Sequence, residues 1–131
     1  ANTFGIRGEY GDLEDLVRLL WDEPDTRQAY LPIFFPEDTG KGDGGRKPCT
    51  LGYHFILREG RLHTYYPMRS CDFYRHWADD VYLTIRLSMW ILDQLKDHPI
   101  WSGVEVGSFT MHCTSLHMFI NDFHLMENQR A

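Results

Sequence analysis

Two strand-like segments separated by a two-residue turn constrain the fold of this chain more than any other feature. Residues 50–58 and 61–69 are rich in β-branched and aromatic side chains, and Glu59-Gly60 lies between them. This arrangement is typical of a β-hairpin. Residues 29–35 form a further strand-like run before the hairpin, and Pro32 within it favours an edge strand or a bulge.

Helical periodicity surrounds these strands. Apolar residues recur at helical spacing over residues 12–21, where Asp12 is suited to capping the helix, and over residues 79–97. The rest of the chain predicts a strand over residues 104–112 and a closing helix over residues 114–126. Residues 36–48 have the composition of a loop. The predicted order, α-β-β-β-α-β-α, indicates a mixed α/β or α+β fold.

Composition narrows the class of protein. The 131 residues correspond to a single domain, residues 1–131, and the net charge of −6 argues against a general nucleic-acid binder. No apolar run approaches the roughly 20 residues of a membrane span, so we expect no membrane partner. Three cysteines without short spacing favour a reducing, cytoplasmic location. The histidines match no familiar zinc spacing, so no metal is predicted.

Two segments carry candidate chemistry. Cys49 follows a glycine-rich stretch and lies close to Arg46 and Lys47, and nearby cations favour a nucleophilic thiolate. The alternative is that Cys49 is a small apolar residue at a strand start. The tetrapeptide at residues 69–72, Arg-Ser-Cys-Asp, combines a guanidinium fork, a hydroxyl and a carboxylate, which suits anion and hydroxyl binding. Its alternative is an ordinary charged turn.

In this order, these segments resemble motifs of the thymidylate synthase family, which includes pyrimidine-nucleotide hydroxymethylases. Residues 25–27, Asp-Thr-Arg, resemble the family's Asp-Ser-Arg-Arg turn, and Pro48-Cys49 resembles its Pro-Cys nucleophile. Residues 68–72, Met-Arg-Ser-Cys-Asp, resemble its Gln-Arg-Ser-x-Asp motif. Residues 106–112 stand where the family has Gly-Asp-x-His-x-Tyr. The resemblance covers about residue 10 to the end of the chain.

The resemblance implies a fold and a reaction. The fold is a mixed sheet with helices on one face, and the other face packs against a second subunit as a homodimer. Aromatic and β-branched residues on both faces of the hairpin, including Tyr53, Phe55, Tyr65 and Tyr66, favour a sheet whose face packs against a second subunit. The reaction transfers a one-carbon unit from 5,10-methylenetetrahydrofolate to C5 of a pyrimidine nucleoside monophosphate. A cysteine adduct at C6 divides this reaction into easier steps.

The resemblance also implies roles for individual residues. Cys49 is expected to be the nucleophile, and Arg69 and Ser70 are expected to bind the nucleotide phosphate. Arg27 is expected to reach the phosphate in the partner subunit's site. Asp72 is expected to accept hydrogen bonds from the folate pterin. Thr110 and His112 stand where the family has the His and Tyr that hold the sugar hydroxyl.

One departure from the family pattern bears on the choice of base. The family's Pro-Phe-Asn aligns with Ala78-Asp79-Asp80, and the asparagine of that motif reads the uracil edge. Cytosine presents an amino donor and a bare N3 acceptor, and a protonated carboxyl group complements both. Asp80 therefore favours a cytosine nucleotide, dCMP or CMP, with hydroxymethylation as the reaction. The alternative is that Asp79 and Asp80 only stabilise a helix N-terminus.

Other departures keep two further functions open. Gln28 and Met68 replace a phosphate arginine and a glutamine of the family, and the family's terminal segments have no counterpart here. The alternatives are a thymidylate synthase that acts on dUMP and a catalytically silent homologue that binds nucleotides or assembles with a partner.

Overall fold

The computed structural model describes residues 12–40 and 45–129, so part of the predicted glycine-rich loop, residues 41–44, lies outside the described residues. The helices and strands follow the predicted order, with one short 3-10 helix inside the predicted loop. They are α1 (Leu13–Asp22), β1 (Tyr30–Pro32), η1 (Pro36–Asp38), β2 (Gly52–Arg58), β3 (Arg61–Asp72), α2 (Trp77–Leu95), β4 (Glu105–His117) and α3 (Ile120–Asn128).

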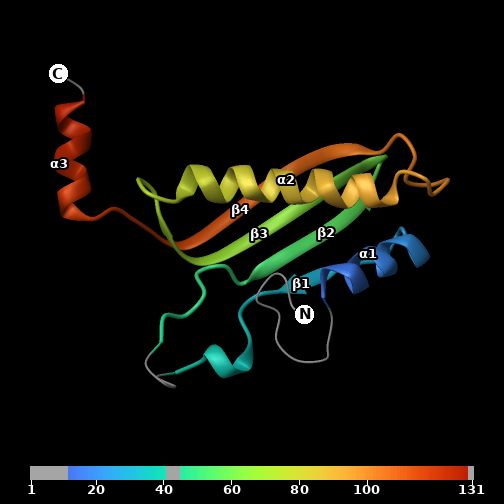
Figure 1. Cartoon of the computed structure of the whole chain (residues 1–131), viewed down its shortest axis with the longest axis horizontal. Coiled ribbons are helices and arrows are strands. Elements are labelled where there is room, and N and C mark those ends of the chain that lie inside the picture. Colours follow the sequence, from blue (N-terminus) through green and yellow to red (C-terminus); the bar gives the residue numbers. More distant parts are fainter. Residues whose placement is uncertain (1–11, 41–44, 130–131) are drawn as a thin grey trace.

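The strands form a mixed sheet in the order β1-β2-β3-β4. Antiparallel pairing joins β1 to β2 and β2 to β3, whereas β3 and β4 are parallel and are connected through α2. Figure 1 shows α2 running along the sheet with α1 beside it, while α3 stands apart beyond one end of the sheet. We call the face of the sheet opposite α1 and α2 the open face.

The predicted hairpin is present in the structure. Arg58 pairs with Arg61, and the intervening Glu59 and Gly60 have φ values of 53° and 71°. Positive φ at both central residues is the requirement of the turn that best matches the twist of a two-residue hairpin. The turn therefore fixes the register of β2 against β3 at its tightest point.

The C-terminal part of the chain differs from the prediction. The residues from Thr114 to His117, predicted as the start of a helix, continue β4, and α3 begins only at Ile120. The cause is the long parallel pairing with β3, which extends to Asp72 opposite His117. Backbone hydrogen bonding to a neighbouring strand overrides the local helical pattern at these positions.

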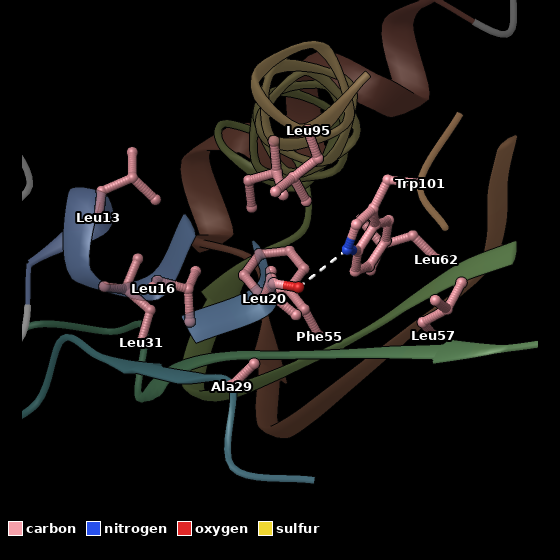
Figure 2. Packing of buried hydrophobic residues seen from close by; sticks show 11 residues of the cluster. Leu13, Leu16, Leu20, Ala29, Leu31, Phe55, Leu57, Leu62, Leu95 and Trp101 are labelled. Carbon is pink, nitrogen blue, oxygen red and sulfur yellow. Dashed lines mark hydrogen bonds between the residues drawn. The ribbon is translucent and has the colours of Figure 1, made fainter. Parts of the chain in front are cut away.

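The main core lies between the sheet and the two helices. Figure 2 shows leucines of α1 facing Phe55, Leu62 and Leu95. Trp101, which is 1% exposed and follows α2, packs into the same cluster. Its indole Nε1 donates a 2.8 Å hydrogen bond to the carbonyl of Leu20, one of the last carbonyls of α1. This bond satisfies a helix-terminal acceptor that burial would otherwise leave unpaired.

The aromatic residues of the hairpin are divided unequally between the two faces. Phe55 and Tyr66 are buried on the helix side, and Tyr53 stacks on Tyr66 with ring centroids 4.7 Å apart. Only Tyr65 of the four aromatic residues that we associated with a packed sheet face lies on the open face. A row of paired positions crosses that face from one edge of the sheet to the other: Tyr30, His54, Tyr65 and Thr110.

No helix among the described residues is long and apolar enough to cross a membrane.

Replacement of Trp101 by phenylalanine is expected to destabilise the fold. The change removes the indole donor and leaves the carbonyl of Leu20 buried without its partner, so the free energy of unfolding should fall by about 2 kcal/mol. Urea unfolding followed by circular dichroism measures this loss. Trp90→Phe is a matched control, because Trp90 is 41% exposed and its replacement should change stability by less than about 0.5 kcal/mol. Equal stabilities for the two variants would contradict the role given to the Trp101 bond.

Candidate functional site

Cys49 and Arg69 come together on adjacent chain segments. The residues before β2 continue the antiparallel pairing with β3, because the amide of Arg69 donates to the carbonyl of Cys49 at 2.8 Å. Between the side chains, Nη2 of Arg69 lies 3.7 Å from Sγ of Cys49. Nε of Arg69 also donates a 3.3 Å hydrogen bond to the backbone carbonyl of Pro48. Cys49 is exposed. An exposed thiol beside a guanidinium has the environment of a reactive cysteine.

The same face of the sheet carries the residues predicted to bind the sugar. Thr110 pairs with Tyr65 and His112 pairs with Pro67, so alternation along β4 directs both side chains to the open face. Both residues are exposed. His112 therefore lies in the middle of β4, not at a strand end as the sequence predicted, and it is close along the sheet to the position of Arg69.

Asp80 lies in the first turn of α2, on the other side of the sheet. Its carboxyl group is half-buried, and Oδ2 accepts a hydrogen bond from the thiol of Cys71 at 3.8 Å. Burial raises the pKa of Asp80 above its ordinary value, and Asp79 adds to this shift. His76 and the bond from Cys71 act in the opposite direction. A carboxyl group in this setting is closer to its protonated form than an exposed aspartate.

Asp72 ends β3 and organises the turn that leads into α2. Its Oδ1 accepts backbone hydrogen bonds from Tyr74 and Arg75, each 3.0 Å long. Its other carboxyl oxygen, Oδ2, is buried and has no hydrogen-bond partner among the described residues. A buried acceptor without a partner is unfavourable, so this oxygen is available to a donor that the described residues do not supply.

Ser70 and Arg27 lie further from the Cys49 pair. The hydroxyl of Ser70 is 3.4 Å from Nδ1 of His117, near the end of β4. Arg27 is exposed and lines a shallow polar hollow of about 460 Å³ with residues 23–28. His54 donates to the backbone carbonyl of Arg27 at 3.0 Å and Arg58 donates to that of Asp25 at 3.3 Å, which anchors this turn along β2. Cys49 precedes the Gly52 end of β2, and no contact between described residues joins its side chain to Arg27.

A buried chain of hydroxyl groups links the two sides of the site. Thr50, next to Cys49, is hydrogen-bonded to the hydroxyl of Tyr66 at 2.6 Å. The hydroxyl of Tyr53 interacts with both Tyr66 and Thr84, and burial raises the pKa of Tyr53 despite these bonds. Thr84 in turn donates to the backbone carbonyl of Asp80 at 2.7 Å. No direct hydrogen bond or ion pair between described residues joins Cys49 to Asp72 or Asp80, and the hydroxyl chain runs from Thr50 to the backbone of Asp80.

Sequence reasoning missed the residues of this network. Tyr53 and Tyr66 were assigned to a packed sheet face, and Thr84 and Cys71 were given no role. The available indication for Thr84 is its spacing, since it lies one helical turn after Asp80. Cys71 lies inside the Arg-Ser-Cys-Asp segment whose other members were all assigned.

Sequence comparison identifies relatives of one kind. Deoxyuridylate hydroxymethyltransferase of Bacillus phage SP01 is 35% identical over 124 residues, which are 94% of this chain and 30% of that protein. A putative thymidylate synthase of Methanothermobacter thermautotrophicus is 32% identical over 92% of this chain and 52% of its own length. The putative thymidylate synthase of Methanosarcina barkeri is 24% identical over 96% of this chain and 56% of its own length. The chain thus spans about half the length, or less, of these curated relatives.

Structure comparison agrees on the fold. Thermostable thymidylate synthase A from Bacillus subtilis matches with a TM-score of 0.73 over 98% of this chain and 44% of that one, at 18% sequence identity. No protein-family model matches the chain. The fold is therefore that of part of a thymidylate synthase. By sequence, the chain is similar to a deoxyuridylate hydroxymethyltransferase and to putative thymidylate synthases, the kind of protein that its ordered motifs resemble.

The three cysteines should differ in their rates of alkylation because they differ in exposure. Cys49 is exposed, Cys113 is half-buried and Cys71 is buried. We expect iodoacetamide to modify Cys49 first, then Cys113, and Cys71 only on unfolding. Peptide mapping by mass spectrometry over a time course measures the order, and Cys49→Ser should lack the fastest phase. Early modification of Cys71 would show that the thiol environments differ from those described.

Proposed function

We propose that this chain carries the nucleotide-modifying part of an enzyme that transfers a one-carbon unit from methylenetetrahydrofolate to C5 of a pyrimidine nucleotide. The observation that carries the proposal is the exposed thiol of Cys49 held beside the guanidinium of Arg69. The relatedness of the chain to a deoxyuridylate hydroxymethyltransferase and to putative thymidylate synthases supports the same class of reaction.

The proposed chemistry begins at Cys49. Its thiolate adds to C6 of the pyrimidine, so an S–C6 bond forms and the electrons of the C5–C6 double bond move toward C5, which becomes the nucleophile. Once C5 has taken up the one-carbon unit and lost its proton, the folate carrier would depart as tetrahydrofolate. Water would then supply the hydroxyl oxygen, and expulsion of the thiolate from C6 would restore the C5–C6 double bond. Arg69 and Ser70 bind the phosphate. Thr110 and His112 are the residues proposed for the sugar, and they lie on the open face, across the sheet from Asp80.

Asp72 is the residue proposed to hold the folate. The pterin ring presents N–H donors, and Oδ2 of Asp72 is a buried acceptor without a partner among the described residues. An N–H group of this kind can donate a hydrogen bond to such an unpaired acceptor. When bound, methylenetetrahydrofolate supplies the one-carbon unit, and the chain supplies its orientation.

The base is proposed to be cytosine, in dCMP or CMP, and the product a hydroxymethyl nucleotide. Asp80 supports this choice, because burial raises its pKa and a protonated carboxyl can both accept from the cytosine amino group and donate to N3. A uracil nucleotide is the second candidate. The similarity to the phage protein favours a uracil nucleotide, because that protein is named for action on deoxyuridylate.

Tritium release from C5-labelled dCMP, CMP and dUMP, with methylenetetrahydrofolate present, tests this function. We expect release from a cytosine nucleotide, and we expect Cys49→Ala to abolish it while circular dichroism stays unchanged. Asp80→Asn should shift kcat/KM from the cytosine toward the uracil nucleotide by about tenfold, because a mismatched polar edge leaves buried groups unpaired at about 1–3 kcal/mol each.

Three outcomes would contradict parts of this proposal. Tritium release that survives Cys49→Ala would exclude the covalent step. An unchanged base ratio in Asp80→Asn would make Asp80 a helix-terminal residue only. A folded protein without release from any of the three nucleotides would favour a silent homologue that binds nucleotides or assembles with a partner.

A homodimer through the open face is the proposed assembly. No helix among the described elements covers this face, and Tyr30 and Tyr65 are both exposed on it. No contact between described residues joins Arg27 to Cys49 or Arg69 within one chain, so a second copy is proposed as the source from which Arg27 would reach the phosphate. A C2 pairing would bring each Arg27 to the partner subunit's site.

Mixing two inactive variants tests this assembly. Cys49→Ala and Arg27→Ala should each be impaired alone, whereas a heterodimer of the two contains one site with both native residues. Random exchange of subunits should therefore restore about a quarter of wild-type activity. Sedimentation of the wild-type chain at micromolar concentration provides the control for dimer formation. A monomer in sedimentation, or no recovery after mixing, would contradict the shared site.

A further inference from the structure

Cys71 lies directly beneath the first turn of α2. The residue is 2% exposed and packs with Tyr66 and Met68 in a small second core cluster. Its Sγ donates to Oδ2 of Asp80 across 3.8 Å. This contact joins the end of β3, which carries Arg69 and Asp72, to the helix that carries Asp80.

The chemistry of Cys71 differs from that of Cys49. Burial raises the pKa of the Cys71 thiol to about 12, and Cys113 and Asp80 shift it in the same direction. The residue is therefore a neutral thiol at physiological pH, which excludes it as a nucleophile and leaves an S–H group that can donate. A carboxylate only accepts, so the thiol and Oδ2 of Asp80 are complementary.

The backbone of Asp80 is fixed independently of its side chain. Its amide donates to the carbonyl of His76 at 2.9 Å, and its carbonyl accepts from the hydroxyl of Thr84 at 2.7 Å. Among the described residues, the Cys71 thiol is the one group that hydrogen-bonds to the carboxyl oxygens of Asp80. The helix therefore fixes the backbone of Asp80, and the hydrogen bond from Cys71 orients the carboxyl group of Asp80.

We propose that Cys71 is a positioning residue for base recognition: its thiol holds Oδ2 of Asp80 and so fixes the orientation of the carboxyl group that is proposed to meet the amino group and N3 of the bound pyrimidine. The proposal rests on the proposed function, in which Asp80 reads the base. It assigns Cys71 a role in substrate discrimination without contact to the substrate.

The first test uses the ligand-free protein, so it is independent of turnover. The groups that face or adjoin the Asp80 carboxyl are Cys71, His76, Asp79, Tyr53 and Tyr66. Removal of the thiol in Cys71→Ala takes away a donor to the ionised carboxylate, so the pKa of Asp80 should rise further above that of the wild type. Cys71→Ser supplies a hydroxyl donor and should keep the pKa near the wild-type value. NMR titration of the carboxyl carbon measures all three proteins.

Cys113→Ala is the matched control. Cys113 packs against the same cluster and interacts with the Cys71 thiol, but no hydrogen bond between described residues joins it to Asp80. Its replacement should leave the pKa of Asp80 unchanged, whereas a shift as large as that in Cys71→Ala would assign the effect to general packing and overturn the proposal. An unchanged pKa in a folded Cys71→Ala protein would overturn it as well.

The second test measures base discrimination. The ratio of kcat/KM between cytosine and uracil nucleotides is measured at a pH below the pKa of Asp80 in all variants, so that protonation does not differ between them. It should fall about threefold in Cys71→Ala, because a weak hydrogen bond that orients the carboxyl is lost, and it should be retained in Cys71→Ser. In an Asp80→Asn background, Cys71→Ala should change the ratio no further. An equal further change there would overturn the proposal. If no nucleotide is turned over, the proposed function fails, and the titration of Asp80 still decides whether Cys71 orients its carboxyl group.

Discussion

The register of β3 is the constraint on which the rest of the structure depends. This strand is paired along both edges, antiparallel to β2 and parallel to β4, and its residues from Arg61 to Arg69 alternate between the two faces of the sheet. Tyr66 and Met68 consequently face the helices, whereas Arg69 faces outward beside Cys49. A slip of one residue would exchange the faces, bury the guanidinium and expose the core.

The hairpin turn and the long helix could be predicted from the sequence because their determinants are local. Glu59-Gly60 specifies a tight turn, and the apolar residues of α2 recur at the helical period. The end of β4 could not be predicted in the same way. Thr114 to His117 belong to the strand because Ser70 to Asp72 continue alongside them, and this partner lies more than forty residues earlier in the chain.

The distribution of the site residues shows a similar division. The proximity of Cys49 to Arg69 follows from a hairpin whose first strand is extended backward, so a correct register places these residues opposite each other. The bond between Cys71 and Asp80 has no such local origin, because the turn at residues 73–76 sets how α2 returns over the end of β3. Asp72 shapes that turn with one carboxyl oxygen and leaves the other unpaired among the described residues. Strand pairing therefore predicts the Cys49–Arg69 part of the site, whereas the geometry of the turn determines the part that contains Asp72 and Asp80.

The environment of Asp80 is costly for a residue that only stabilises a helix N-terminus. An acidic residue interacts with the helix dipole from an exposed position, as Asp79 does in the same turn, and no backbone amide is capped by the Asp80 carboxyl among the described hydrogen bonds. Burial instead raises the pKa of Asp80, so the folded chain holds this proton more tightly than the unfolded chain does. Its stabilising contribution is thus present below the unfolded pKa and is lost as the pH rises through the folded pKa. At neutral pH the ionised carboxylate therefore lowers the free energy of unfolding. The same raised pKa favours the protonated carboxyl group that a bound cytosine would require.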